Sequence, residues 1–500
     1  MDMDMEKLKA LSLSDPDLDR PSQLILFHPP STFPSPSGRL PIELLSEIFL
    51  LCVGTAMDKH HTIHMPLLVS KICSRWRSAA IANPKLWSRL FLELTPPNPT
   101  ASSPSSPRSP STPISSPIPQ KNMVETWLAR SGACPLTVYV LWEDPPVAST
   151  HPVLDALVEH CTRWHTMFFY LPFPAFRSFS RIRNRLPMLT ELSLGMDDRD
   201  ISGTTPGEDN KVDMFENAPR LRSLECVNFS PTMFKFPWNQ LQDIPLLAIT
   251  IDEALDILYR AKRLVKAGFI FVDGNHNTIW HPTQHRYIEH NHLRCFTLMT
   301  PPLNEIISLR PLFPHLSFPQ LESLTICNLK SPFGPEFTQF LSQLHVLKTL
   351  HLRNTALSDE QLVEGLKCLP SLTSLIVHSS NSGSVGSQEP EPTVTQYLFR
   401  ALTRNFFSSS SIDDGMLLPR LKNLEMTLSS YITLAALDDL LEMLQSRLRE
   451  DGIGVVRLEN VRLRSSADLD EEFLIHLIEL RDFGLAVSVE GAGVGIEEPQ

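Results

Sequence analysis

The sequence lacks the features that mark several large classes of protein. Its 500 residues contain no apolar run long enough to span a membrane and no recognisable signal peptide. The eight cysteines are scattered without a Cys-x-x-Cys pair, so we expect reduced thiols and a location in the cytoplasm, the nucleus or both. Lysine and arginine form no dense run and the formal net charge is −12, which argues against binding to nucleic acid or to an anionic membrane.

The sequence also lacks the motifs of common enzymes. It has no Gly-x-Ser-x-Gly turn, no glycine-rich phosphate loop and no His-Glu-x-x-His helix, so we expect no enzymatic activity, no catalytic residue and no cofactor. Histidines do gather between residues 276 and 292, with Cys295 close by. Their spacing lacks the tight ligand pairs of a structural zinc site, so we expect solvated loop residues and no metal at His276, His281, His285, His290 and His292. A metal-dependent enzyme that uses this loop stays open as a rival interpretation.

Apolar residues between Leu40 and Leu94 recur at helical spacing. In the first part of this stretch the spacing predicts a helix with an apolar face formed by Leu40, Leu44, Leu45, Ile48, Phe49 and Cys52. Pro41 suits the first helical turn, where its fixed φ helps and its missing N–H costs nothing. A second helix is predicted from about Leu67 to Ile81, and Asn83-Pro84 should stop it. Two short helices hold too little apolar surface for a sizeable core, so a partner or the rest of the chain must cover them.

This segment resembles an F-box. The matching patterns are LPxELLxxIF from Leu40, LVxxxCxxW from Leu68 and PxLW from Pro84. The stretch between Cys52 and Met65, VGTAMDKHHTIH, is longer and more polar than the usual turn between the F-box helices. An ordinary helical hairpin that packs on its own domain is the alternative interpretation.

The resemblance implies a function in protein degradation. An F-box binds the Skp-type adaptor of a cullin–RING ubiquitin ligase, while the rest of the chain selects the protein to be ubiquitylated. Large apolar residues of the segment are then either its core or its contacts with the adaptor. The adaptor-binding residues that the resemblance implies are Leu40, Pro41, Leu44, Leu45, Ile48, Phe49, Leu68, Val69, Cys73, Trp76, Leu86 and Trp87. The rival is an interaction scaffold with no role in ubiquitylation.

Two stretches have the composition of disordered chain. Residues 1–37 read as a disordered tail and residues 95–121 as a flexible linker, because PPNPTASSPSSPRSPSTPISSPIP offers almost nothing to bury. Between them, residues 38–94 form the expected F-box domain. Several hydroxyl residues of the linker directly precede proline, so the candidates for proline-directed phosphorylation are Ser103, Ser106, Ser109, Thr112 and Ser116. An unmodified spacer is the equal alternative.

A short leucine phrase returns through residues 122–500. It has a proline two residues before a leucine, followed by apolar residues three and five positions later, as in LPMLTELSL (Leu186), APRLRSLEC (Ala218), FPQLESLTI (Phe318), LPSLTSLIV (Leu369) and LPRLKNLEM (Leu418). Two further copies lack the proline: HNHLRCFTL from His290 and LHVLKTLHL from Leu344. Proline cannot continue a preceding helix, and the later apolar residues share one face of an extended chain. Each phrase therefore predicts a turn from a helix into a strand.

The phrase resembles a leucine-rich repeat. The anchors Leu293, Leu321, Leu347 and Leu372 lie 28, 26 and 25 residues apart, which is the period of such repeats. The spacing breaks at 46 residues after Leu247 and at 49 residues after Leu372. The asparagine that closes a consensus repeat also lies one residue early, at Asn228, Asn328 and Asn354.

The expected fold class is therefore α/β, a short helical F-box hairpin followed by an irregular leucine-rich-repeat solenoid of strand–helix units. Residues 122–500 form this repeat domain, and its C-terminal part should close it as a cap of helix, strand, helix and strand. The layout resembles the large F-box family of mushroom-forming fungi, in which the repeats would bind the target protein. The outward strand positions expected to contact the target are Ser193, Glu225, Thr325, His351, Arg353 and Glu425.

Overall fold

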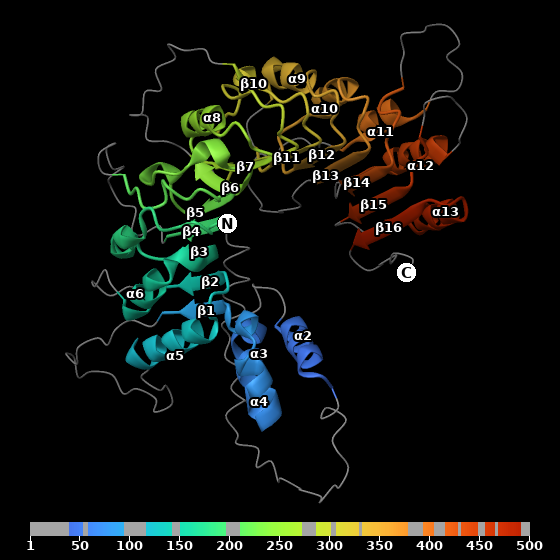
Figure 1. Cartoon of the computed structure of the whole chain (residues 1–500). Helices are drawn as coiled ribbons and strands as arrows, with labels where there is room; N and C mark the ends of the chain where they lie inside the picture. The colour runs from blue at the N-terminus through green and yellow to red at the C-terminus, as the bar shows by residue number, and fades with distance from the viewer. Residues whose placement is uncertain are drawn as a thin grey trace, which may run out of the picture. The chain divides into compact units, whose positions relative to one another are not determined.

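The computed structural model describes the chain in thirteen stretches that form two compact units. The described residues are 40–53, 59–94, 117–142, 151–196, 211–272, 287–301, 307–329, 333–378, 394–404, 416–428, 432–448, 456–465 and 469–491. The N-terminal unit comprises Met1–Arg220 with Phe234–Phe236, and the C-terminal unit comprises Leu221–Met233 with Pro237–Gln500. Both units are mixed α/β (Figure 1).

The described part of the N-terminal unit begins with three helices, α2 (Ile42–Cys52), α3 (Lys59–Ile72) and α4 (Ser74–Ile81). The single helix predicted from Leu67 to Ile81 is wrong, because the chain breaks at Cys73. This residue is extended (φ −156°), and its Sγ accepts a hydrogen bond from the N–H of Trp76 at 3.5 Å, which caps α4. The polar stretch before Met65 is not a simple turn either, since α3 already begins at Lys59. Pro41 immediately precedes α2, and the helical run ends before a short 3₁₀ turn, Pro84–Trp87.

Four parallel strands follow in the same unit: β1 (Arg89–Glu93), β2 (Leu136–Leu141), β3 (Trp164–Tyr170) and β4 (Glu191–Gly195). The connections between them contain α5 (Pro117–Arg130), α6 (Pro152–Glu159) and the short α7 (Phe173–Phe176). α5 therefore starts inside the range predicted as linker. Aromatic rings fill the core of this unit: the Phe169 and Phe179 ring centroids lie 5.1 Å apart, and those of Phe176 and Phe234 lie 5.4 Å apart.

The C-terminal unit continues the same parallel plan with one strand after another in chain order. Its sheet contains β5 (Ser223–Val227), β6 (Asp243–Ile249), β7 (Lys266–Phe271), β9 (Cys295–Met299), β11 (Ser323–Cys327), β12 (Thr349–Arg353), β13 (Ser374–His378), β14 (Asn423–Leu428), β15 (Asn460–Ser465) and β16 (Ala486–Gly491). A separate parallel pair joins β8 (Ile288–Glu289) and β10 (Leu316–Ser317). Together the two runs hold fourteen strands, which confirms the α/β class with a large parallel sheet.

Each of the seven leucine phrases forms a strand, as predicted. The turn before the strand repeats the same hydrogen bond, for example from the N–H of Leu321 to the carbonyl of Phe318 at 3.1 Å and from Leu372 to Leu369 at 3.1 Å. The next carbonyl along then accepts two N–H donors of the following strand: Glu322 accepts from Lys348 and Thr349. The phrase thus sets both the turn and the strand register, and its anchor leucine and the apolar residues three and five positions later are buried.

Three asparagines end strands in a left-handed conformation. Asn228, Asn328 and Asn354 follow β5, β11 and β12 directly and have φ values of 64°, 58° and 51°. Asparagine tolerates this region better than most side chains. Asn354 also donates its side-chain amide to Oδ1 of Asn328 at 2.9 Å, which ties neighbouring strand ends together.

The two breaks in the leucine spacing have different causes. The 46-residue gap holds a complete helix and strand, α8 (Ile251–Arg260) and β7, in which Ala267 and Phe269 stand where the phrase has its later apolar residues. The array is therefore not interrupted there. Across the 49-residue gap, β13 and β14 still pair directly in parallel, and the crossover between them contains α11 (Gln396–Leu402).

Helices lie along one face of the C-terminal sheet (Figure 1). They are α8, α9 (Pro335–Leu341), α10 (Asp359–Lys367), α11, α12 (Leu434–Leu448) and α13 (Glu471–Asp482). A capping box at Ser358 and Gln361 starts α10, the helix predicted between Ser358 and Cys368. The predicted C-terminal order of helix, strand, helix and strand is also confirmed, by α12, β15, α13 and β16. In the described part of the chain, no helix combines the length and the apolar content needed to cross a membrane.

Candidate functional site

The first candidate site is an apolar stripe on the surface of α2. Leu44, Ile48 and Leu51 are spaced by four and three residues, so they share one side of the helix. They are 51%, 41% and 82% exposed, respectively. The exposed apolar surface of these side chains gains nothing from the fold of the chain itself, and a contiguous group of such side chains is typical of an interaction surface.

The neighbouring side of α2 forms the core of the helical segment. Leu45 and Phe49 are fully buried, and the Phe49 ring lies 5.1 Å from the half-buried ring of Trp76 on α4. Of the residues predicted to be either core or adaptor contacts, the structure places Leu45, Phe49, Val69, Leu86 and Trp87 in the core. It leaves Leu44, Ile48 and Leu68 on the surface, together with Pro41 and Cys73, whereas Leu40 is partly exposed.

A second, shorter stripe lies on α3, which contacts α2. Leu68 and Ile72 are one helical turn apart and are 54% and 56% exposed. The name "helical face" is used below for the exposed apolar residues of both helices, Leu44, Ile48, Leu51, Leu68 and Ile72. Leu51 and Ile72 were not among the residues predicted to bind a partner, although the spacing of Leu51 from Leu44 carries the signal.

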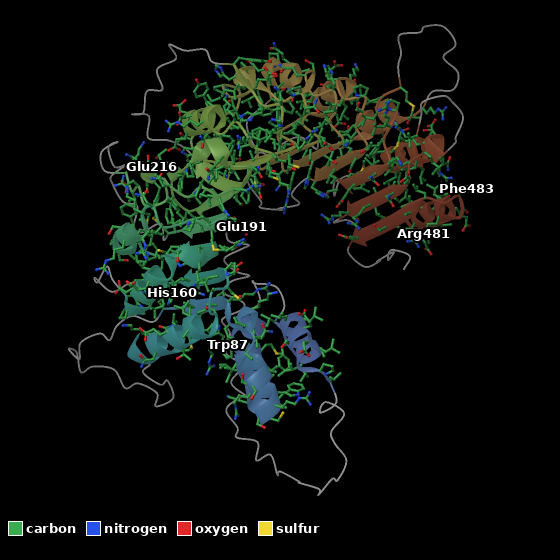
Figure 2. The ribbon with its side chains drawn as sticks, viewed as in Figure 1. Trp87, His160, Glu191, Glu216, Arg481 and Phe483 are labelled. Carbon is green, nitrogen blue, oxygen red and sulfur yellow. The ribbon has the colours of Figure 1, made fainter. Side chains whose placement is uncertain are left out.

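Backbone acceptors hold the helices in this arrangement. The Arg75 guanidinium donates to the carbonyl of Leu40, and the Asn83 amide donates to the carbonyl of Ser46 at 3.4 Å, so α4 and the turn after it hold α2 at its N-terminal end and near its middle. Trp87 (Figure 2) donates its indole N–H to the carbonyl of Ala80 at 2.7 Å and packs edge-on against Trp127 at 4.7 Å between ring centroids. These contacts fix the positions of the helices that carry the exposed apolar residues.

The second candidate site is the face of the C-terminal sheet opposite the helices. Register pairs Thr325 with His351, His351 with Ile376, Ile376 with Glu425, and Glu425 with Arg462. The structure thus brings four of the predicted target-binding residues together, since Arg353 lies two positions after His351 on β12. Ser193 lies on β4 in the N-terminal unit and Glu225 on β5, apart from this group along the strand order.

Ionic groups connect four strands on this face. Glu425 lies 3.2 Å from Nε2 of His378 and 3.3 Å from Nη2 of Arg464, and Arg464 also contacts Glu490 at 2.9 Å. Burial lowers the pKa of His351 and of His378, and the nearby arginines act in the same direction while Glu425 opposes them. Both imidazoles are therefore neutral at pH 7. With Nε2 protonated, His378 donates to Glu425 and accepts from the Thr427 hydroxyl, whose oxygen lies 3.0 Å from Nδ1.

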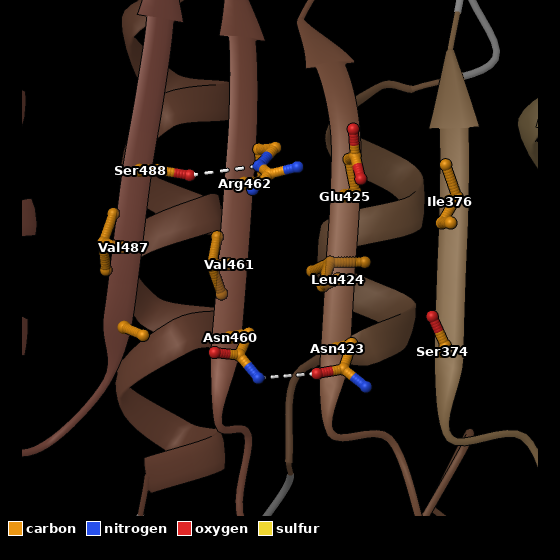
Figure 3. A pocket seen from close by; sticks show the side chains of 11 residues that line it. Ser374, Ile376, Asn423, Leu424, Glu425, Asn460, Val461, Arg462, Val487 and Ser488 are labelled. Carbon is orange, nitrogen blue, oxygen red and sulfur yellow. Dashed lines mark hydrogen bonds between the residues drawn. The ribbon is translucent and has the colours of Figure 1, made fainter. Parts of the chain in front are cut away.

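An open groove of about 340 Å³ lies beside this network, over β13 to β16 (Figure 3). Its polar lining consists of Ser374, Asn423, Glu425, Asn460, Arg462 and Ser488. The Asn460 amide donates to Oδ1 of Asn423 at 2.7 Å, and Nε of Arg462 lies 3.4 Å from the Ser488 hydroxyl. Amide, hydroxyl and ionic groups in one shallow groove suit hydrogen bonding to an extended peptide. Sequence reasoning missed His378, Arg462 and Arg464, although each lies at an alternate position of a predicted strand.

The structure describes only some of the remaining predicted site residues. The candidate phosphorylation residues Ser103, Ser106, Ser109, Thr112 and Ser116 lie outside the described residues, as do His276, His281 and His285. The prediction of a solvated loop residue is wrong for His290, which is buried with its Nε2–H donating to the carbonyl of Leu258 at 2.7 Å, whereas His292 is exposed. Among the residues that the structure describes, no three histidine, cysteine or acidic side chains are grouped as metal ligands. Neither a protein-family model nor a curated protein sequence matches the chain.

Proposed function

We propose that the chain is a substrate-recognition subunit of a cullin–RING ubiquitin ligase. In this proposal the helical face of α2 and α3 binds a Skp-type adaptor, and the C-terminal sheet binds the protein to be ubiquitylated. The observation that carries the proposal is the exposure of Leu44, Ile48, Leu51, Leu68 and Ile72 on helices whose other side is a packed core. Of the adaptor contacts expected from the resemblance to an F-box, Leu44, Ile48 and Leu68 are available on this face, whereas Leu45 and Phe49 belong to the core.

The repeat architecture forms part of the same proposal. An irregular leucine-rich-repeat solenoid is supported by the seven strands that carry the leucine phrase, by parallel pairing in chain order and by helices on one face. In such an array the face opposite the helices is the usual binding surface. The groove over β13 to β16 and the ionic network beside it are then the places where the target would be held.

The proposed role is non-catalytic. A standard protein–protein interface of about 1,600 Å² would bury the helical face, with its large apolar residues as the main contributors to affinity. The ligase's other subunits would bring the ubiquitin-conjugating enzyme. Holding a target lysine close to that enzyme raises its effective concentration, and this proximity is the contribution of the chain.

The proposal is tested by asking whether the chain retains a cullin only in the presence of the adaptor. The full chain is immobilised and incubated with a purified cullin, with or without a purified Skp-type adaptor. We expect cullin to be retained only when the adaptor is present, because the adaptor bridges the two. Ile48→Asp should abolish retention of both proteins, since it places a charge in the helical face.

The matched control is Leu434→Asp, which places the same charge at a residue of α12 that is 67% exposed. It should retain both proteins as the wild type does. If a folded wild-type chain retains neither, or if Ile48→Asp retains both, the proposed function is refuted.

A further inference from the structure

The last helix that the structure describes, α13, exposes a second apolar surface. On α13, Phe473, Leu477 and Leu480 point into the core, whereas Ile475 and Ile478 are 51% and 49% exposed. Phe483, at the C-terminal end of α13 (Figure 2), is 67% exposed. The inward residues already secure the helix to the sheet, so the fold does not account for the three outward ones.

Carboxylates surround these apolar side chains. On the helical period, the outward residues of α13 besides Ile475 and Ile478 are all acidic: Glu471, Glu472, Glu479 and Asp482. The name "α13 face" is used below for these six residues and Phe483. The adjacent helix α12 exposes two more acidic residues, Asp438 and Glu442.

Basic groups of the same two helices are directed elsewhere. Arg481 donates from Nε and Nη2 to the carbonyl of Val487 on β16, at 3.2 and 2.6 Å. Arg447 is buried, with three of its nitrogens bonded to backbone carbonyls. The α13 face is therefore apolar in the middle, with carboxylates around it and the Arg457 guanidinium at its C-terminal end beside Gly484.

Charge decides what can cover this face. Nucleic acids and anionic membranes are repelled by it, and a second copy of a chain with net charge −12 is a poor complement. The residues after β16, 492–500, include Glu497 and Glu498 but no lysine or arginine, so they do not complement it either. A basic partner is required.

We propose that the α13 face binds a basic amphipathic helix of another protein. Apolar residues of that helix would cover Ile475, Ile478 and Phe483, and its lysines or arginines would pair with the surrounding carboxylates. Spacing by three, four and seven residues is how helices present such anchors to one another. This surface is separate from the helical face of α2 and α3, so the inference does not rest on the proposed function.

The probe is a fluorescein-labelled 18-residue peptide of leucine and lysine, patterned as an amphipathic helix. Its binding to the full chain is measured by fluorescence anisotropy at 50 and 300 mM salt. A peptide of the same composition in scrambled order is the control for general charge attraction. We expect the patterned peptide to bind at least 10-fold more tightly than the scrambled one, and more weakly at high salt.

Two variants locate the site. I475S/I478S removes exposed apolar surface without touching the core, and we expect it to raise the Kd of the patterned peptide at least 5-fold. E471K/E479K reverses charge on the same face and should have an effect of similar size. The matched control Y397S/L434S removes two other exposed apolar side chains, on α11 and at the start of α12, and should leave the Kd unchanged. Equal Kd values for all four proteins, or equal binding of both peptides, would overturn the proposal.

Discussion

Arg447 allows a sharp test of how the C-terminal unit is held together. Its side chain is only 2% exposed and lies inside the last turn of α12. Nε donates to the carbonyl of Leu402 at 2.8 Å, Nη1 to that of Leu418 at 2.8 Å and Nη2 to that of Leu417 at 2.6 Å. One side chain thus joins the end of α11 to the turn before β14. Leu418 also has a left-handed backbone (φ 50°), which few non-glycine residues adopt.

Two opposing effects set the expected magnitude. Burial, with a smaller effect of Arg404, lowers the pKa of Arg447 to about 10, so the guanidinium is still charged at pH 7. Relative to the ordinary value this costs the charged form roughly 3 kcal/mol. Each hydrogen bond from a charged donor contributes about 1.5–3 kcal/mol, and each carbonyl left without a donor costs about 1–3 kcal/mol. Because the three carbonyls remain in place, we expect Arg447→Met to destabilise the unit by about 3–5 kcal/mol.

The assay combines chemical denaturation with hydrogen exchange. Arg447→Met should lower the denaturation midpoint and speed amide exchange in α11 and β14 while leaving α9 and α10 protected. The control is Arg400→Met, which removes the ion pair of the mostly exposed Arg400 side chain with Asp439 at 2.8 Å and should change stability by less than about 1 kcal/mol. If both variants behave like the wild type, the three carbonyl contacts do not stabilise the fold and the reasoning is refuted.

Two further predictions concern strand packing and pH. A Cβ at Gly268 would lie 2.2 Å from the carbonyl oxygen of Pro245, at the point where β6 and β7 change register. Gly268→Ala should therefore lower the denaturation midpoint by the equivalent of about 2 kcal/mol, and an unchanged midpoint would contradict this. The second prediction concerns His290, whose pKa is lowered mainly by burial. Its imidazole is therefore neutral in the folded chain at pH 7. Its contribution to stability is present above pH 6.5 and is lost as pH falls below that value, because protonation would add a proton at the buried Nδ1, which has no acceptor among the residues that the structure describes. From pH 7 to pH 5 the wild type should lose more stability than His290→Gln, measured by urea denaturation, whereas a variant of the exposed His345 to Gln should follow the wild type.

Much of the strand plan could be predicted because it depends on local chemistry. The proline and leucine of each phrase set a turn and bury alternate residues, and both effects act within nine residues of chain. The helix after Ser358 was predictable for the same reason, since its capping box is written in consecutive residues.

The misses arise where contacts or backbone geometry override the pattern. Cys73 has helical neighbours on both sides, and only its extended backbone and the thiol cap on Trp76 divide α3 from α4. β7 was not predicted because Ala267 and Phe269 stand where the phrase has leucines. Glycine is needed at position 268, between them, because the carbonyl of Pro245 lies too close for a side chain.

The candidate sites were predictable only in part. Apolar periodicity cannot separate Leu45, which is buried, from Leu44, which is exposed, because both lie on the apolar side of α2 and the packing of α4 decides between them. Register placed His351 and Glu425 on one row with Ile376 between them, but their link through His378 and Arg464 depends on side-chain directions across several strands.

The most direct test of the central claim is calorimetric titration of a purified Skp-type adaptor into the full chain. The account predicts saturable one-to-one binding by the wild type and by Leu434→Asp. Leu44→Asp should bind at least 100-fold more weakly, because a buried leucine contributes about 1.5–3 kcal/mol and an unpaired buried carboxylate costs more. Absence of binding by a folded wild-type chain, or undiminished binding by Leu44→Asp, would contradict the account.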